Sequence, residues 1–357
     1  MRATWMSENR RGLLGILIVI VIAGAAGVLA FTVPSRGASA GDVQDALHKA
    51  NVYIETAKTT ERAVESWERY QSWVNMKTGP TGKERYIDYG MYEVYDVAGL
   101  LKEARAAADL KPSVAKLDAI MPRYIDAYEA LAPVINKATA YYDGKGYEAD
   151  NAAEGQALHK QMVPLVTAFL AARETMMPDL RVFVRDVEGQ ELAGIEAREG
   201  RKAAWQVGNV LHTANRVLDV FPRMRPQQIG GDELDAMIQD LGPESSGEKF
   251  DQVIAGVVPP KANVIDVKRF SEALGAYTKA VEEFDGFKGE KPDDFDGFKG
   301  FPRQVLDMLR AFQTPLIKSE GRKFDGDGQM FGQIVQTYFE MFNEGSGMVG
   351  SQLRFLP

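Results

Sequence analysis

The 357-residue chain contains no cysteine and only three histidines. Without cysteine it cannot form disulfides, thiolate metal sites, a thiolate nucleophile or a lipid-modified cysteine. His48, His159 and His212 lie far apart in the sequence, and none belongs to a paired ligand motif of the HExxH kind. We therefore expect no bound metal and no cofactor.

The chain also lacks an excess of positive charge outside the amino terminus. The chain carries 50 acidic and 42 basic residues, a net charge of −8. Its first 40 residues hold four arginines and one glutamate, so the remainder is near −11. A domain this acidic repels phosphate backbones, so we expect no nucleic-acid partner.

Two common catalytic motifs are missing as well. The sequence has no GxSxG, and its glycine pairs lack the spacing and the Lys-Ser/Thr end of a P-loop. These absences favour a non-enzymatic protein. They leave one alternative open, because spacing in the sequence cannot reveal acids that meet from separate helices.

One long apolar run is present near the amino terminus. Residues 13–31 are uncharged and long enough to cross a bilayer as a helix. Arg10 and Arg11 precede them, which predicts that residues 1–12 are cytoplasmic and that the rest lies across the membrane. The small residues before position 41 also suit cleavage after Ala40, but a signal peptide usually has a shorter apolar core of ~7–15 residues. We expect a retained single-pass anchor, with a cleaved, soluble periplasmic form as the alternative.

After Ala40 the apolar residues recur at helical spacing, without the alternation of strands. The pattern predicts an all-α fold, an elongated antiparallel multi-helix bundle behind the membrane helix. We expect a main bundle over residues 41–222 and a C-terminal helical part, residues 231–357, packing on it. The individual helices are predicted at about 43–76, 87–108, 114–142, 158–170, 178–221, 232–241, 264–284, 303–312 and 329–342.

A short duplication lies in the C-terminal part. Residues 284–289 and 295–300 both read FDGFKG. Its glycine content suggests a duplicated surface loop. The alternative is an exposed two-pronged contact for a partner, made by Phe287 and Phe298.

Residues 140–159 are the most informative candidate site. Gly144 and Gly146 are expected at positive φ, ending a helix, and Asn151 with Glu154 has the spacing of a capping box. A calcium loop is excluded, because Lys145 stands at a ligand position. The stretch therefore reads chiefly as a joint between two helices.

The same stretch could also form a groove for a polar envelope ligand. Phenol, carboxylate and imidazole groups together are a suitable mixture for such a ligand. We prefer the interpretation that two of the three tyrosines in the stretch pack against their neighbours, and the groove is the alternative. The candidate groove residues are Tyr141, Tyr142, Asp143, Tyr147, Asp150 and His159.

Several blocks occur in an order typical of one family. They are residues 79–85, 124–127, 141–142, 147–150, 155–159, 195–200 and 301–303. With these blocks the chain resembles the YiiG-like family of bacterial envelope proteins, a domain of unknown function usually met in lipoproteins. The chain departs from that pattern because it has no lipid-accepting cysteine. The resemblance implies an envelope location and a helical architecture, and it implies no reaction.

These observations together predict a location and a kind of function. We expect a single-pass protein of the bacterial inner membrane, held in the membrane by residues 13–31, with its main domain in the periplasm. The leading hypothesis is a non-enzymatic binding or scaffold protein with an envelope protein or the cell wall as partner. The alternative is a periplasmic hydrolase that acts on cell-wall material with acids from separate helices.

Overall fold

A computed structural model describes residues 40–221, 264–292, 295–321 and 328–350. Throughout these ranges the regular elements are helices and no strand occurs, which confirms the predicted all-α bundle. The predicted membrane segment 13–31 and the predicted helix 232–241 lie outside the described residues. Among the helices that are described, none is both long and apolar enough to cross a membrane.

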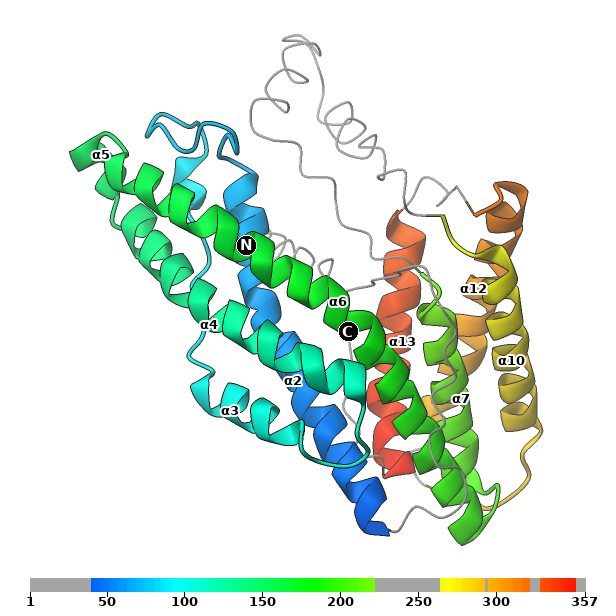
Figure 1. Ribbon diagram of the computed structural model, residues 1–357. Coiled ribbons are helices and arrows are strands. Elements are labelled where there is room, and N and C mark those ends of the chain that lie inside the picture. Colours follow the sequence, from blue (N-terminus) through cyan, green and yellow to red (C-terminus); the bar gives the residue numbers. More distant parts are fainter. Residues whose placement is uncertain (1–39, 222–263, 293–294, 322–327, 351–357) are drawn as a thin grey trace, which may run out of the picture.

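The first half of the chain forms a bundle around two long antiparallel helices, α4 and α6 (Figure 1). Helix α2 packs against α6 and α3, and its buried face is rich in aromatic residues such as Tyr53 and Tyr70. The elements of this bundle are α2 (Ala40–Gln71), η1 (Ile87–Tyr89), α3 (Ala98–Ala107), α4 (Ala115–Asp143), α5 (Gly146–Asp150) and α6 (Ala153–Glu199).

The second bundle has its own apolar core. Helix α7 packs closely against α10 and α13, and α12 packs against the same two helices. The apolar side chains of α7 belong to this second core, so the stretch 41–222 contributes to both bundles. The elements are α7 (Ala203–Leu218), α10 (Val267–Gly286), α11 (Phe295–Phe298), α12 (Phe301–Lys318) and α13 (Gly328–Val349).

Helix α6 links the two bundles. It runs for 47 residues from the tip near α5 to the second bundle (Figure 1). The sequence predicted two helices here, interrupted before Pro178, and this was wrong. An internal proline removes one hydrogen bond and crowds the preceding turn, but Met176, Met177 and Leu180 beside it are buried, and their packing holds the helix in place. The helix ends at Gly200, whose φ of 75° and ψ of −171° suit only glycine.

A predicted helix over residues 87–108 is only partly formed. Only α3 and the short η1 are helical there, and the segment between them is irregular. The apolar face predicted there is partly confirmed: Ile87, Met91, Val94 and Leu101 are buried, whereas Ala98 is exposed and Ala108 is half-buried. The backbone of this segment bonds to side chains of neighbouring helices instead of to itself, as described below.

The repeated FDGFKG segments do not form an exposed contact. Phe298 is fully buried, and the Phe284 ring lies 4.9 Å from that of Phe295 in a stacked pair. Phe287 is half-buried beside Phe295. The two-pronged partner contact was therefore a wrong prediction, because both copies place their phenylalanines on the second core.

Two buried basic side chains stabilise the first bundle. Lys49 donates to the carbonyl oxygens at positions 108, 110 and 112, and its Nζ lies 2.6 Å from a carboxylate oxygen of Asp118. Arg173 pairs with Glu61 and donates to the Tyr124 hydroxyl at 3.0 Å. Both charges are paired and hydrogen-bonded, as buried charges must be, and we assign them a structural role.

Candidate functional site

The six candidate groove residues lie at one end of the first bundle, where α4, α5 and α6 meet (Figure 1). Tyr141, Tyr142, Tyr147 and His159 are buried, whereas Asp143 is exposed and Asp150 is half-buried. The structure therefore brings the four ring side chains into the packing of the joint and leaves the two carboxylates at its surface.

Three of the four buried rings, Tyr141, Tyr147 and His159, make specific hydrogen bonds. Tyr141 donates to Asp150 at 2.8 Å, and Tyr147 donates to Asp88 at 2.9 Å. His159 Nδ1 lies 3.0 Å from the Tyr70 hydroxyl. Burial lowers the pKa of His159, which favours the neutral ring. No group of three potential metal ligands occurs among the residues that the structure describes.

The glycines of the joint have a different role from the predicted one. Gly144 has φ −79°, and the left-handed positions are Lys145, Asn151 and Ala152, with φ of 53°, 53° and 62°. At Gly146 a Cβ atom would lie 2.5 Å from the Tyr141 ring. Glycine is therefore required there for the close approach of that ring, and the prediction of positive φ at both glycines was wrong.

The predicted capping box of Asn151 and Glu154 does not form: the N-cap residue of α6 is Ala152, and the carboxylate that reaches its first turn belongs to Asp150. The Glu154 backbone N–H donates to the Asp150 carboxylate at 2.9 Å. This hydrogen bond, with a smaller effect of the Tyr141 hydroxyl, lowers the pKa of Asp150. Asn151 instead follows α5 in a left-handed conformation, which asparagine adopts more readily than most residues.

Residues 86–95, which we call the tyrosine segment, contain η1 and the irregular stretch after it, and hydrogen bonds from neighbouring helices fix their backbone at several points. Trp73 donates its indole N–H to the Gly90 carbonyl at 2.9 Å. The Ser66 hydroxyl donates to the Tyr92 carbonyl at 2.7 Å and accepts from the Tyr92 N–H at 3.1 Å. The Asn136 side-chain amide donates to the Val94 carbonyl at 3.0 Å and accepts from the Val94 N–H at 2.8 Å. The backbone of the segment is thus fixed by contacts within the protein itself.

Tyrosines recur at every third position of this segment. Tyr86 and Tyr89 stack with ring centroids 5.2 Å apart. The guanidinium groups of Arg62 and Arg69 lie 3.8 and 4.4 Å from the centroid of the Tyr92 ring. Tyr89 and Tyr95 are 52% and 65% exposed, although large aromatic side chains are usually covered in a folded protein. The segment thus presents aromatic rings and guanidinium groups together.

Sequence reasoning missed the tyrosine segment. Its apolar residues were assigned to a helical face, and the tyrosines between them were ignored. The available signal was the spacing of Tyr86, Tyr89, Tyr92 and Tyr95, which would wind around a helix and cannot form a single buried stripe.

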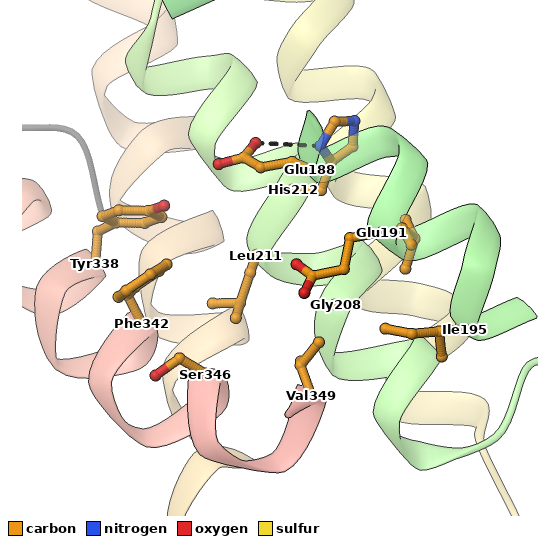
Figure 2. A pocket seen from close by; sticks show the side chains of 11 residues that line it. Glu188, Glu191, Ile195, Gly208, Leu211, His212, Tyr338, Phe342, Ser346 and Val349 are labelled. Carbon is orange, nitrogen blue, oxygen red and sulfur yellow. Dashed lines mark hydrogen bonds and ion pairs between the residues drawn. The ribbon is translucent and has the colours of Figure 1, made fainter. Parts of the chain in front are cut away.

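A cavity lies between α6, α7 and α13, away from the joint (Figure 2). Helix α6 contributes two acids, α7 a histidine and α13 two aromatic rings. Its lining residues are Glu188, Glu191, Leu192, Ile195, Gly208, Leu211, His212, Tyr338, Phe342, Ser346 and Val349. Most of this wall is apolar, and the polar groups are few.

Glu188, a polar group of the cavity, contacts polar side chains of α7. His212 Nδ1 lies 3.4 Å from one carboxylate oxygen of Glu188, and Asn215 donates to the other at 2.7 Å. Burial raises the pKa of Glu188, and this effect exceeds the opposing influence of His212 and Asn215. Figure 2 shows Glu188 turned toward His212 and Glu191 directed to the side of Leu211. Sequence analysis had treated His212 as an isolated histidine, since its partner lies on another helix.

The family described as Protein of unknown function (DUF3829) matches residues 44–242, more than half of the chain. The chain belongs to this family. The match takes in the first bundle, the joint, the tyrosine segment and α7. It does not extend to α13, so one wall of the cavity lies outside the matched part of this DUF3829 protein.

A curated relative supports the same assignment. The chain is 32% identical over 157 residues to "Uncharacterized protein YiiG" of Escherichia coli (strain K12). The aligned part covers 43% of this chain and 44% of the relative, so the chain spans less than half the length of that protein. The predicted YiiG-like resemblance is confirmed. No solved structure matches this DUF3829 protein.

Proposed function

We propose that this protein is a non-enzymatic scaffold of the bacterial envelope, anchored in the inner membrane by residues 13–31. The uncharged run and the arginines before it support this orientation, with residues 1–12 in the cytoplasm and both helical bundles in the periplasm. Cleavage after Ala40 would give the same domain in soluble form.

The tyrosine segment carries this proposal. Tyrosine and arginine are enriched among the residues that dominate binding energy at protein interfaces. Tyrosine supplies a large contact area while losing little conformational entropy. Here the backbone is already fixed by Ser66, Trp73 and Asn136, so little further ordering is needed on binding.

The chemistry of the segment favours a protein as its partner. Arg69 and Arg85 flank the rings of Tyr89 and Tyr86 at 5.8 and 5.1 Å, while Glu93 is exposed within the same segment. Alternating rings and charges of both signs match the mixed surface of another polypeptide. We therefore propose an envelope protein rather than the cell wall as the partner.

Photocrosslinking in intact cells tests this proposal. A photoreactive phenylalanine derivative placed at Tyr95 should form one discrete protein adduct, because that side chain is 65% exposed. The additional substitution Tyr89→Ala should reduce the adduct about tenfold, corresponding to ~1.4 kcal/mol of binding free energy. The melting temperature should be unchanged, since Tyr89 is half exposed.

The matched control places the same photoreactive group at Ile317 in the second bundle, which is 49% exposed. This position should give no discrete adduct. Equal adducts at Tyr95 and Ile317 would contradict a specific surface. An adduct that disappears after digestion of the cell wall would assign the segment to the cell wall instead.

A hydrolase acting on cell-wall material is the second candidate function, and the cavity favours it. There a carboxylate with a raised pKa lies beside an imidazole, an arrangement suited to acid–base chemistry. Both acids of the cavity belong to α6, with His212 as the group from a separate helix. Release of soluble fragments from purified sacculi, abolished by Glu188→Gln, would establish this function and overturn the scaffold proposal.

A further inference from the structure

The backbone of residues 90–97 is extended, and its hydrogen bonds fall on alternate positions. No helix, turn or bend occurs in this stretch. Gly90, Tyr92 and Val94 bond through their backbone groups to side chains of the first bundle. In an extended chain the N–H and C=O groups of successive residues point to opposite edges. The edge formed by the even-numbered positions therefore faces the bundle.

The opposite edge of this stretch is unpaired. Its positions are Met91, Glu93 and Tyr95, and within the described residues their backbone N–H and C=O groups make no hydrogen bond. Glu93 and Tyr95 are also exposed as residues. Their donors and acceptors recur every second residue, a distance of about 7 Å along an extended chain. An unpaired row of this kind is a template for pairing with another chain.

We propose that this edge binds an extended segment of a partner polypeptide as an added strand. The N–H and C=O groups of Glu93 and Tyr95 pair with the main chain of that segment, and the Tyr95 ring packs on the residue opposite it. The inference rests on the proposed scaffold function and deepens it. It names the form of the partner at the tyrosine segment, an extended chain rather than a folded surface.

The protein holds the edge in the form that pairing requires. The side chains of Ser66 and Asn136 take the place of a neighbouring strand, because each bonds to both the N–H and the C=O of one residue. Binding therefore requires little further ordering of the backbone. A metal ion or a small anion could use only the acceptors or only the donors of the alternating row, whereas an extended polypeptide matches both.

The charge of the stretch indicates which segments it accepts. Glu93 and Asp96 are exposed, and neither makes an ion pair within the described part of the chain. A guest segment with basic residues at its ends complements these carboxylates.

Titration of the purified full chain with a short β-forming peptide tests the proposal. The probe is acetyl-Lys-Val-Thr-Val-Thr-Val-Lys-amide, whose central residues favour strands. The matched control is the same peptide N-methylated at every central residue, which keeps the side chains and loses the main-chain donors. We expect saturable binding of the probe and at least about tenfold weaker binding of the control.

Two substitutions at Glu93 separate the backbone donor from the side chain. Glu93→Pro removes the outward N–H, and the fold is expected to persist because proline is accepted where the N–H of an edge strand faces solvent. Glu93→Ala removes the same charge and keeps the N–H. The proline variant should bind the probe at least about tenfold more weakly than the alanine variant.

Hydrogen exchange at single amides provides a measurement that needs no variant. The N–H groups of Glu93 and Tyr95 should exchange rapidly in the free chain and at least about tenfold more slowly with bound probe. Those of Tyr92 and Val94 are already hydrogen-bonded and should change little. Slow exchange at Glu93 and Tyr95 without the probe would overturn the proposal, because another part of this chain or a second copy would then cover the edge.

Absence of saturable binding, equal affinity for the two peptides, or equal affinity of the two Glu93 variants would each overturn the added strand. These failures differ from failure of the scaffold proposal, which is measured by the adduct at Tyr95 in cells. An adduct that persists undiminished in Glu93→Pro retains the protein partner and overturns the added strand. A probe that binds the purified chain when cells give no adduct supports the added strand and overturns the scaffold proposal.

Discussion

At the scale of single residues, Asp150 determines how the joint between α5 and α6 is held. Its carboxylate accepts hydrogen bonds from the Glu154 N–H and the Tyr141 hydroxyl at the same time. We predict that Asp150→Ala lowers the melting temperature at pH 7, whereas Asp150→Asn, which keeps an acceptor, lowers it less. Thermal unfolding of the three proteins checks the order.

The effect should depend on pH. The pKa of Asp150 in the folded state lies below the usual value of 3.8. Its contribution is therefore fully present above pH 3.8 and is lost as the pH falls through the folded-state pKa. The difference between Asp150→Ala and the unmodified chain should shrink in that acid range. A difference that stays constant down to about pH 2 would contradict the role of the ionised carboxylate.

Residue types alone located this joint, but they predicted the wrong capping contact and the wrong backbone conformation for its glycines. The sequence shows that a helix ends after Tyr142 and that another begins near position 153. It could not show that Asp150 rather than Asn151 accepts from the first turn of α6, because both side chains are good acceptors and only the backbone conformation distinguishes them. Nor could it show that Tyr147 reaches Asp88, since the two are 59 positions apart.

At the scale of helices, two glycines of α6 respond oppositely to the same substitution. Gly200, where the helix ends, has a backbone conformation that is nearly exclusive to glycine, so Gly200→Ala should cost about 1–3 kcal/mol of unfolding free energy. Gly194 lies inside the helix with only the flexible Arg198 side chain nearby. Gly194→Ala should therefore stabilise by about 0.5–1 kcal/mol.

Urea unfolding of both variants against the unmodified chain measures these values. Changes of the same sign would show that α6 does not continue through position 194 and end at Gly200. The sequence suggested an interruption because Pro178 suits the first turn of a new helix. The continuous helix depends on burial by residues from both bundles, which a local pattern cannot reveal.

At the scale of the whole molecule, α6 connects the two bundles, each of which has its own apolar core. The tyrosine segment lies at the end of the first bundle near α5, and the cavity lies where α6 meets α7 and α13 (Figures 1 and 2). The all-helical architecture could be predicted because the apolar spacing is local. The cavity could not be predicted, because Glu188, His212 and Phe342 meet only through packing of three helices.

The most direct test of the scaffold proposal uses the absence of cysteine, since any introduced thiol is unique. Tyr95→Cys lies within the tyrosine segment, and Lys268→Cys lies on α10 at a side chain that is 87% exposed. Cells whose outer membrane has been permeabilised are treated with a thiol reagent that cannot cross the inner membrane. The labelling of each variant is compared with that of the same variant after purification.

The proposal predicts that Lys268→Cys is labelled in cells as fully as after purification, because the bundles are periplasmic. Tyr95→Cys should be protected in cells and labelled after purification, because a partner covers it only in the envelope. Equal labelling of both cysteines in cells would contradict the partner surface. Failure of both to label until the inner membrane is opened would contradict the periplasmic location.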